Sequence, residues 1–169
     1  MNRTVNPLLL AAIAFISGFL SVLIFHQPML IILKAIALAP EKLTPYAMAS
    51  TSPFGVPRVF SLAFWGGIWG IVLAIIVTWI RSGLGYWLSG LIIGALGPSL
   101  VNWFIVQPLK GEPVGGGWAV PGVATSLIIN GVWGLGTVLL FRLFGRNLLD
   151  NRQNSAANTE SEARERINR

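Results

Sequence analysis

The stretch Gly66–Gly70, GGIWG, returns as NGVWG at Asn130–Gly134, a shift of 64 residues along the chain. The same shift places Val56-Pro57 over Val120-Pro121, ahead of each motif. Both motifs lie in long apolar stretches, where the pattern of small residues decides how closely helices pack. The repetition therefore predicts a chain built from two similar halves.

Composition places both halves in a membrane. The chain is 54% apolar and only 11% charged, against about 25% charged residues in an ordinary soluble domain. Four stretches of about 18 to 23 residues contain no Asp, Glu, Lys or Arg. A helix of that length crosses the ~30 Å hydrocarbon core, and the stretches lack the alternation of a membrane β-strand. We therefore expect an all-α membrane protein, with residues 1–146 as one domain of four transmembrane helices. The predicted spans are residues 8–26, 58–80, 84–106 and 121–144.

Prolines mark the ends of the predicted spans. Gln27-Pro28 follows the first span and Gln107-Pro108 follows the third. Helices tend to end before a proline, and proline is favoured at a helix's first position. Each half is thus expected to run as a span ending at Gln-Pro, an external loop, Val-Pro and a second span. This order predicts two duplicated hairpins related by a parallel pseudo-twofold axis along the membrane normal.

The first external loop contains a further apolar segment, Met29–Ala39. Eleven helical residues would measure roughly 16 Å, which is too short to cross the bilayer. The segment is predicted to form a short helix that lies in the outer interface or re-enters the membrane.

Small residues spaced four apart should let these helices approach closely, because lipid supplies little hydrophobic drive between them. The glycines of the predicted helix-packing faces are Gly66 and Gly70, Gly90 and Gly94, and Gly134. Trp69 and Trp133 stand one residue before such a glycine and are predicted to wedge between helices.

The tail, residues 147–169, is polar and is predicted to be disordered. Glu162–Arg166 and Glu165–Arg169 are i,i+4 pairs that favour a short terminal helix instead. At the other end, residues 1–25 contain an apolar stretch longer than the core of a usual signal peptide, so we expect a retained first span.

Four spans place both termini on one side of the membrane. Five Lys or Arg residues lie near the span ends on that side and four on the other, which favours cytoplasmic termini. The five are Arg3, Arg81, Arg142, Arg146 and Arg152, and the four are Lys34, Lys42, Arg58 and Lys110.

The residue inventory excludes most kinds of chemistry. Cysteine is absent, so disulfides and thiolate sites are impossible. No Asp or Glu lies inside a span, which disfavours a proton-driven pump. The net charge of +6 is explained by basic residues at helix ends, so no nucleic-acid partner is expected. The loop Lys110–Gly122 is glycine-rich but lacks the phosphate-loop pattern. We expect no enzyme activity, cofactor or metal.

Five polar residues remain as candidates for sites. Asn102 and Asn130 are possible polar contacts inside the membrane, where interhelical hydrogen bonding is the commoner use of an amide. His26, Gln27 and Gln107 form a possible site on the external face. The alternative for His26, the chain's single histidine, is that it caps the first span at the interface.

Three segments carry a resemblance to other proteins: Phe25-His26-Gln27, Pro53–Pro57 and Phe64–Gly70. Their pattern, FHQ, PFGVP and FWGGIWG, resembles a group of small, uncharacterised four-helix proteins of the bacterial inner membrane. The resemblance covers roughly Phe25 to Gly70. It implies topology and location in the bacterial inner membrane, and it implies no activity.

Two functions compete on this basis. The favoured hypothesis is a non-enzymatic, multi-pass membrane protein that acts by helix–helix association, as a homo-oligomer or as an accessory subunit of a larger complex. Its partners would be the lipid bilayer and itself or another membrane protein. The alternative is a small-solute channel or transporter built from the internal repeat, with Asn102 and Asn130 along its route.

Overall fold

The computed structural model describes residues 6–80 and 83–167, with side chains as far as residue 145. The α-helices are α1 (Pro7–Ser21), α2 (Gln27–Ala35), α3 (Arg58–Val77), α4 (Leu84–Val101), α5 (Gln107–Leu109) and α6 (Val120–Ile167). The π-turn η1 (Val22–His26) joins α1 to α2, the π-turn η2 (Asn102–Val106) joins α4 to α5, and the 3-10 turn η3 (Val114–Trp118) precedes α6. The strands β1 (Ser50–Thr51) and β2 (Val56–Pro57) pair antiparallel, Ser50 with Pro57 and Thr51 with Val56.

Four helical segments of the described residues are long and apolar enough to cross a membrane. They are Pro7–Ala35, Arg58–Val77, Leu84–Leu109 and Val120–Gly145. Each contains most of one predicted span. The prediction of a helical, multi-pass membrane protein with four spans is therefore confirmed at the level of length and composition.

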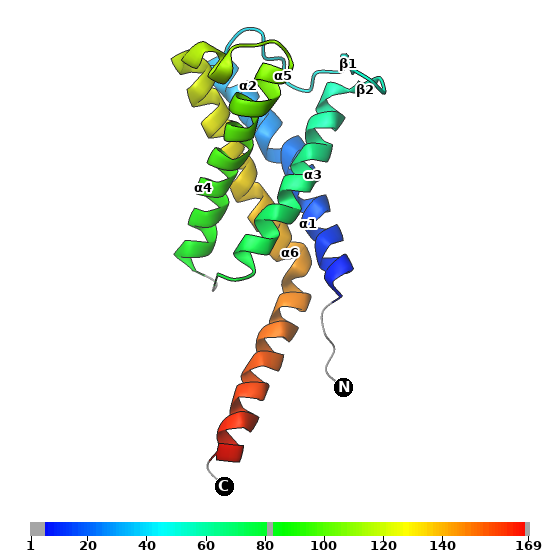
Figure 1. The fold of residues 1–169 in the computed structure, drawn as a ribbon, viewed down its shortest axis with the longest axis vertical. Helices are drawn as coiled ribbons and strands as arrows, with labels where there is room; N and C mark the ends of the chain where they lie inside the picture. The colour runs from blue at the N-terminus through cyan, green and yellow to red at the C-terminus, as the bar shows by residue number, and fades with distance from the viewer. Residues whose placement is uncertain (1–5, 81–82, 168–169) are drawn as a thin grey trace.

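The four long helices do not form an even bundle. α1 packs extensively on α3 and α6, and α4 packs extensively on α6, whereas α3 and α4 touch much less. Figure 1 shows α3 and α4 in front, with α1 and α6 crossing behind them. The loops after α2 and α5 lie at one end, which we name the loop end. The start of α1 and the outgoing part of α6 lie at the other, the terminal end.

In the pairs α1/α3 and α4/α6 the helix backbones touch directly. A Cβ atom added to Gly70 would stand 2.5 Å from the carbonyl oxygen of Ala14 in α1. In the second pair, a Cβ atom on Gly94 would stand 2.6 Å from Cα of Gly134 in α6. Side chains do not fit at such distances, so only glycine permits these crossings. The other two predicted packing glycines lie at the same crossings, Gly66 against Gly18 and Gly90 against Gly134.

The first and third spans do not end at Gln-Pro as predicted. One unbroken helix runs from Pro7 to Ala35, and another from Leu84 to Leu109. A π-turn ahead of each proline shifts the hydrogen bonding by one residue, which lets the helix continue although the proline lacks an N–H. The separate interfacial or re-entrant helix expected in Met29–Ala39 is not confirmed, because residues up to Ala35 extend the first helix.

The polar tail also differs from its prediction, since α6 continues as a helix to Ile167. A tail that extends a helix already formed avoids the cost of nucleating a new one. Figure 1 shows this part of α6 running away from the bundle with no other element beside it. Arg169 of the Glu165–Arg169 pair lies outside the described residues, as do Arg3 and Arg81 of the charge comparison.

Candidate functional site

Polar side chains inside the spans bond mainly to the protein itself. Asn130 of α6 donates an amide N–H to Oγ of Ser99 in α4 over 2.9 Å. Ser21 of α1 donates its hydroxyl to the carbonyl oxygen of Trp133 in α6 over 2.7 Å. Hydrocarbon offers no hydrogen bonds, so such groups must be satisfied within the protein. In this structure Asn130 is thus an interhelical contact.

Asn102, the other predicted intramembrane residue, has a different setting. It begins η2, is half-buried, and its backbone carbonyl accepts the N–H of Gln107. The structure does not bring Asn102 together with Asn130, because η2 and α6 are not in contact.

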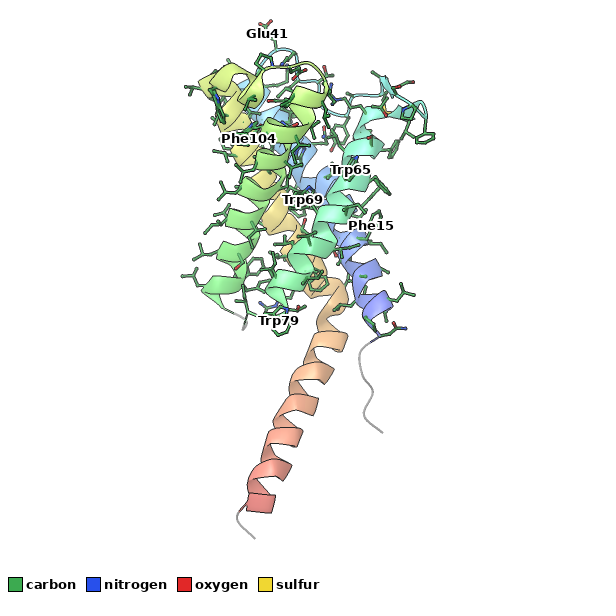
Figure 2. The ribbon with its side chains drawn as sticks, in the orientation of Figure 1. Phe15, Glu41, Trp65, Trp69, Trp79 and Phe104 are labelled. Atoms are coloured by element: carbon green, nitrogen blue, oxygen red, sulfur yellow. The ribbon has the colours of Figure 1, made fainter. Side chains whose placement is uncertain are left out.

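The two repeated tryptophans each reach across to the other helix pair. Trp133 of α6 donates its indole N–H to the carbonyl oxygen of Gly18 in α1 over 2.9 Å. Trp69 of α3 lies over Gly97 of α4, where an added Cβ atom would stand 2.9 Å from the indole ring. Figure 2 shows Trp69 in the space between α3 and α4. Both rings therefore fill gaps between helices, one with a hydrogen bond and one by packing alone.

The first π-turn leaves one backbone acceptor without a helical partner. The N–H of Gln27 bonds to the carbonyl oxygen of Val22, and Pro28 has no N–H to give. The carbonyl of Leu23 would accept from the N–H of Gln27 in an α-helix and from that of residue 28 in a π-helix. Since neither N–H is available, this carbonyl has no partner within the helix. Tyr46, from the loop after α2, donates its hydroxyl to this carbonyl over 2.6 Å.

Tyr46 also joins the predicted pair His26 and Gln27. Its backbone N–H donates to Gln27 Oε1 over 2.7 Å, while Gln27 Nε2 lies 3.3 Å from His26 Nδ1. The Gln27 side chain is 2% exposed, so the buried amide is satisfied at both ends. His26 lies within the continuous helix and does not cap its end. Sequence reasoning missed Tyr46, since no local pattern connects it to a helix nineteen residues earlier.

The second π-turn repeats the backbone arrangement without the tyrosine. The N–H of Gln107 bonds to the carbonyl oxygen of Asn102, and Pro108 has no N–H, so the carbonyl of Trp103 loses its helical partner. Among the described residues, no side chain donates to this carbonyl. Gln107 Oε1 is buried and likewise has no hydrogen-bond partner in the described part of the chain.

A glycine turn and a tryptophan cover this second π-turn. Gly115, Gly116 and Gly117 all have positive φ, at 62°, 62° and 73°, a conformation that glycine adopts without steric cost. A Cβ atom on Gly116 would stand 3.7 Å from Nε2 and 4.0 Å from Oε1 of Gln107. The turn places the Trp118 ring edge-on to Trp103, with centroids 5.6 Å apart.

The external-face site predicted from His26, Gln27 and Gln107 is thus split in two. Gln107 of α5 has no contact with η1 or α2, which contain the other two residues. No group of three or more His, Cys, Asp or Glu side chains that could hold a metal occurs among the described residues. The arrangement at each π-turn can accept hydrogen bonds, and the first turn also contains the imidazole of His26.

Comparison with known proteins adds no family. The chain matches no protein-family model, and it is similar to no curated protein and no solved structure. The resemblance to small bacterial inner-membrane proteins therefore stays a prediction.

Proposed function

We propose that this chain is a non-enzymatic protein of the bacterial inner membrane that acts by association, as a homo-oligomer or as an accessory subunit. The observation that carries the proposal is the pair Phe64 and Trp65 on the outside of α3, which are 50% and 59% exposed. Their rings meet edge to face at 5.9 Å, and Phe64 packs on Phe15 at 5.8 Å. Figure 2 shows Trp65 pointing away from the bundle.

The position of Trp65 makes a lipid-facing role unfavourable. It lies seven residues after Arg58, about 10 Å along the helix, below the interfacial belt where tryptophan N–H groups meet water. A second chain packed on α3 would cover both rings and supply an acceptor for the indole N–H. Exposed aromatic residues of this kind are common anchors of protein interfaces.

The small-residue faces cannot serve this association. The predicted packing glycines, Gly66, Gly70, Gly90, Gly94 and Gly134, are already in contact inside the chain. Association therefore uses the bulky outer surface, while the glycines hold each helix pair together. We further propose that the two pairs are duplicated hairpins related by a pseudo-twofold axis, supported by the matching sequence motifs and glycine crossings, and that both termini are cytoplasmic.

Crosslinking in native membranes and native mass spectrometry in mild detergent test the association. We expect a defined oligomer or one stoichiometric partner, and Trp65→Leu should weaken it. Trp79→Leu is the matched control, because Trp79 is 84% exposed in the turn just after α3, at the terminal end, where an interfacial ring is ordinary. A chain that stays monomeric with no crosslinked partner would contradict the proposal, as would equal effects of the two substitutions.

A small-solute channel is the alternative, and Thr125 favours it. This α6 side chain is fully buried, and its hydroxyl has no hydrogen-bond partner among the described residues. A hydroxyl inside a span needs a partner or water. Flux of small polar solutes into proteoliposomes, lost in Thr125→Val while folding is retained, would establish this reading. Absence of flux in the unmodified protein would remove it.

A further inference from the structure

The hairpin of β1 and β2 carries the most exposed large apolar side chain among the described residues. Phe54 lies in the turn between the two strands and is 87% exposed. The turn closes without this side chain. The N–H of Gly55 donates to the carbonyl oxygen of Thr51 over 2.8 Å, and the Thr51 hydroxyl donates to the carbonyl oxygen of Val56 over 2.8 Å. The Phe54 ring therefore contributes little to the hairpin itself and is available for contact outside the chain.

The base of the hairpin is tied to the start of α3. Pro57, at the N-cap of this helix, makes no side-chain cap bond. Instead the N–H of Arg58 donates to the carbonyl oxygen of Ala49 over 3.0 Å. The N–H of Val59 donates to the carbonyl oxygen of Ala47, also over 3.0 Å. These bonds satisfy two of the N–H groups that the start of a helix leaves unpaired, and they fix the place of the hairpin relative to α3.

The length of α3 sets the depth of the hairpin in the membrane. This helix has 20 residues, so it measures about 30 Å, the thickness of the hydrocarbon core. Its first residue, Arg58, is exposed and belongs at the headgroup layer, where a guanidinium meets phosphate and water. Two residues later, Phe60 is already a lipid-facing ring, 44% exposed. The hairpin, which directly precedes Arg58, therefore lies at the boundary between lipid and water.

The hairpin extends over the lipid and not over the bundle. Figure 1 shows β1 and β2 projecting sideways from the start of α3, away from the other helices. An apolar ring in this position can leave water only by entering the leaflet beneath it or by meeting another protein. Entry into the leaflet needs no further component, because lipid surrounds every membrane helix, and interfacial segments use phenylalanine in this way.

We propose that the Phe54 ring inserts into the lipid of the leaflet at the loop end and anchors the hairpin there. The anchor goes beyond the proposed association and does not depend on it. The loop that forms the hairpin also carries Tyr46, whose hydroxyl and backbone N–H bond to the first π-turn. Residues 46–57 therefore join this turn, the start of α3 and the membrane surface.

Spin labels measure the depth of the hairpin. The chain contains no cysteine, so a single introduced cysteine carries a nitroxide without background. Ser52→Cys places the label in the hairpin turn with Phe54 retained. Glu41→Cys, at the top of the loop end in Figure 2, calibrates water, and Ile75→Cys, at a position 58% exposed on α3, calibrates lipid. Collision rates with oxygen, which concentrates in lipid, and with a water-soluble nickel chelate are measured in nanodiscs.

We expect the label of Ser52→Cys to collide more with oxygen and less with nickel than the label of Glu41→Cys does. Adding Phe54→Ser should raise the nickel collision rate to the water value, because burial of a phenylalanine ring shifts an equilibrium by about tenfold or more. Phe54→Leu keeps an apolar side chain and should leave both rates unchanged. Equal melting temperatures show that all variants are folded, as expected for an exposed position.

Three results overturn the proposal. Collision rates equal to those of Glu41→Cys, with Phe54 retained, place the turn in water. Low collision rates with both reagents show that protein covers the turn instead of lipid. Equal effects of Phe54→Ser and Phe54→Leu show that apolar character is not what holds the turn. None of these measurements involves Trp65, so the crosslinking test of association stands on its own result.

Discussion

The helix pairs α1/α3 and α4/α6 are alike where their backbones cross and unlike at the loop end. At the crossings, Gly70 lies against Ala14 in one pair and Gly134 against Gly90 in the other. At the loop end both first helices continue through a π-turn and a Gln-Pro, yet only the first turn has a tyrosine donor among the described residues. Close packing follows from small residues within the helices, whereas each π-turn is covered by the side chain that the next loop brings to it, Tyr46 at the first turn and Trp118 at the second.

The largest effect is expected at the glycine crossings, where the two helix pairs are alike. Gly70→Leu and Gly134→Leu should each destabilise the protein by overpacking, on the order of 1–3 kcal/mol, because the new side chain meets backbone in both pairs. Gly67→Leu is the control, since the atoms nearest to its Cβ atom belong to the Phe15 ring and not to backbone, and a side chain can move aside. Thermal unfolding in detergent measures all three. Equal damage at Gly67 would show that backbone contact is not the cause.

The second effect separates the two glutamines. Gln27→Leu leaves the backbone N–H of Tyr46 without its acceptor and should cost about 1–3 kcal/mol. Gln107→Leu removes a buried oxygen that has no partner among the described residues, so it should be neutral or stabilising in the isolated protein. Melting temperatures of the two variants under identical conditions check the contrast. A larger loss at Gln107 than at Gln27 would reverse the comparison.

A smaller effect is expected from the tyrosine hydroxyl alone. Tyr46→Phe keeps the ring and the backbone N–H but removes the bond to the Leu23 carbonyl. The expected loss is about 0.5–1.5 kcal/mol, with faster hydrogen exchange confined to the helix around η1. Unchanged stability together with unchanged exchange would mean that the hydroxyl does not close the turn.

The smallest effect concerns Asn130, which stands where the first pair has Gly66. Asn130→Leu should lose roughly 0.6 kcal/mol, the average for a hydrogen bond between membrane helices. A double-mutant cycle with Ser99→Ala should be non-additive, because the two side chains share a bond. The cycle with Asn102→Leu should be additive, since the structure separates those residues. Coupling to Asn102 in place of Ser99 would contradict this packing of α4 on α6.

The spans could be predicted from sequence because their cause is local. A charge-free run of sufficient length must be buried in lipid, and glycines four apart mark where helices meet. The ends of the first and third helices could not be predicted in the same way. Proline only biases a helix to stop, and the π-turns that carry the helix past Pro28 and Pro108 leave no mark in composition.

The loop-end contacts were beyond sequence reasoning for a different reason. Tyr46 approaches Leu23 and Gln27 through an irregular loop whose path has no periodic signal. The asparagines were recognised as polar groups needing partners, yet nothing in the sequence pairs Asn130 with Ser99 rather than with Asn102. The polar tail was expected to be disordered because its own residues drive little order, whereas helix propagation from α6 depends on what precedes it.

The bonds between α1 and α6 act in both directions along one short segment. Ser21 donates to the carbonyl oxygen of Trp133, and the indole N–H of the same Trp133 donates to the carbonyl oxygen of Gly18. Sliding α1 along α6 by one residue would break both bonds at once, so these two bonds fix the register of α1 against α6. Between α3 and α4, Trp69 packs on Gly97 without a hydrogen bond. This apolar contact resists sliding of the two helices less than the hydrogen bonds between α1 and α6 do. Any rocking of one helix pair against the other would therefore pivot on α1 and α6 and open between α3 and α4.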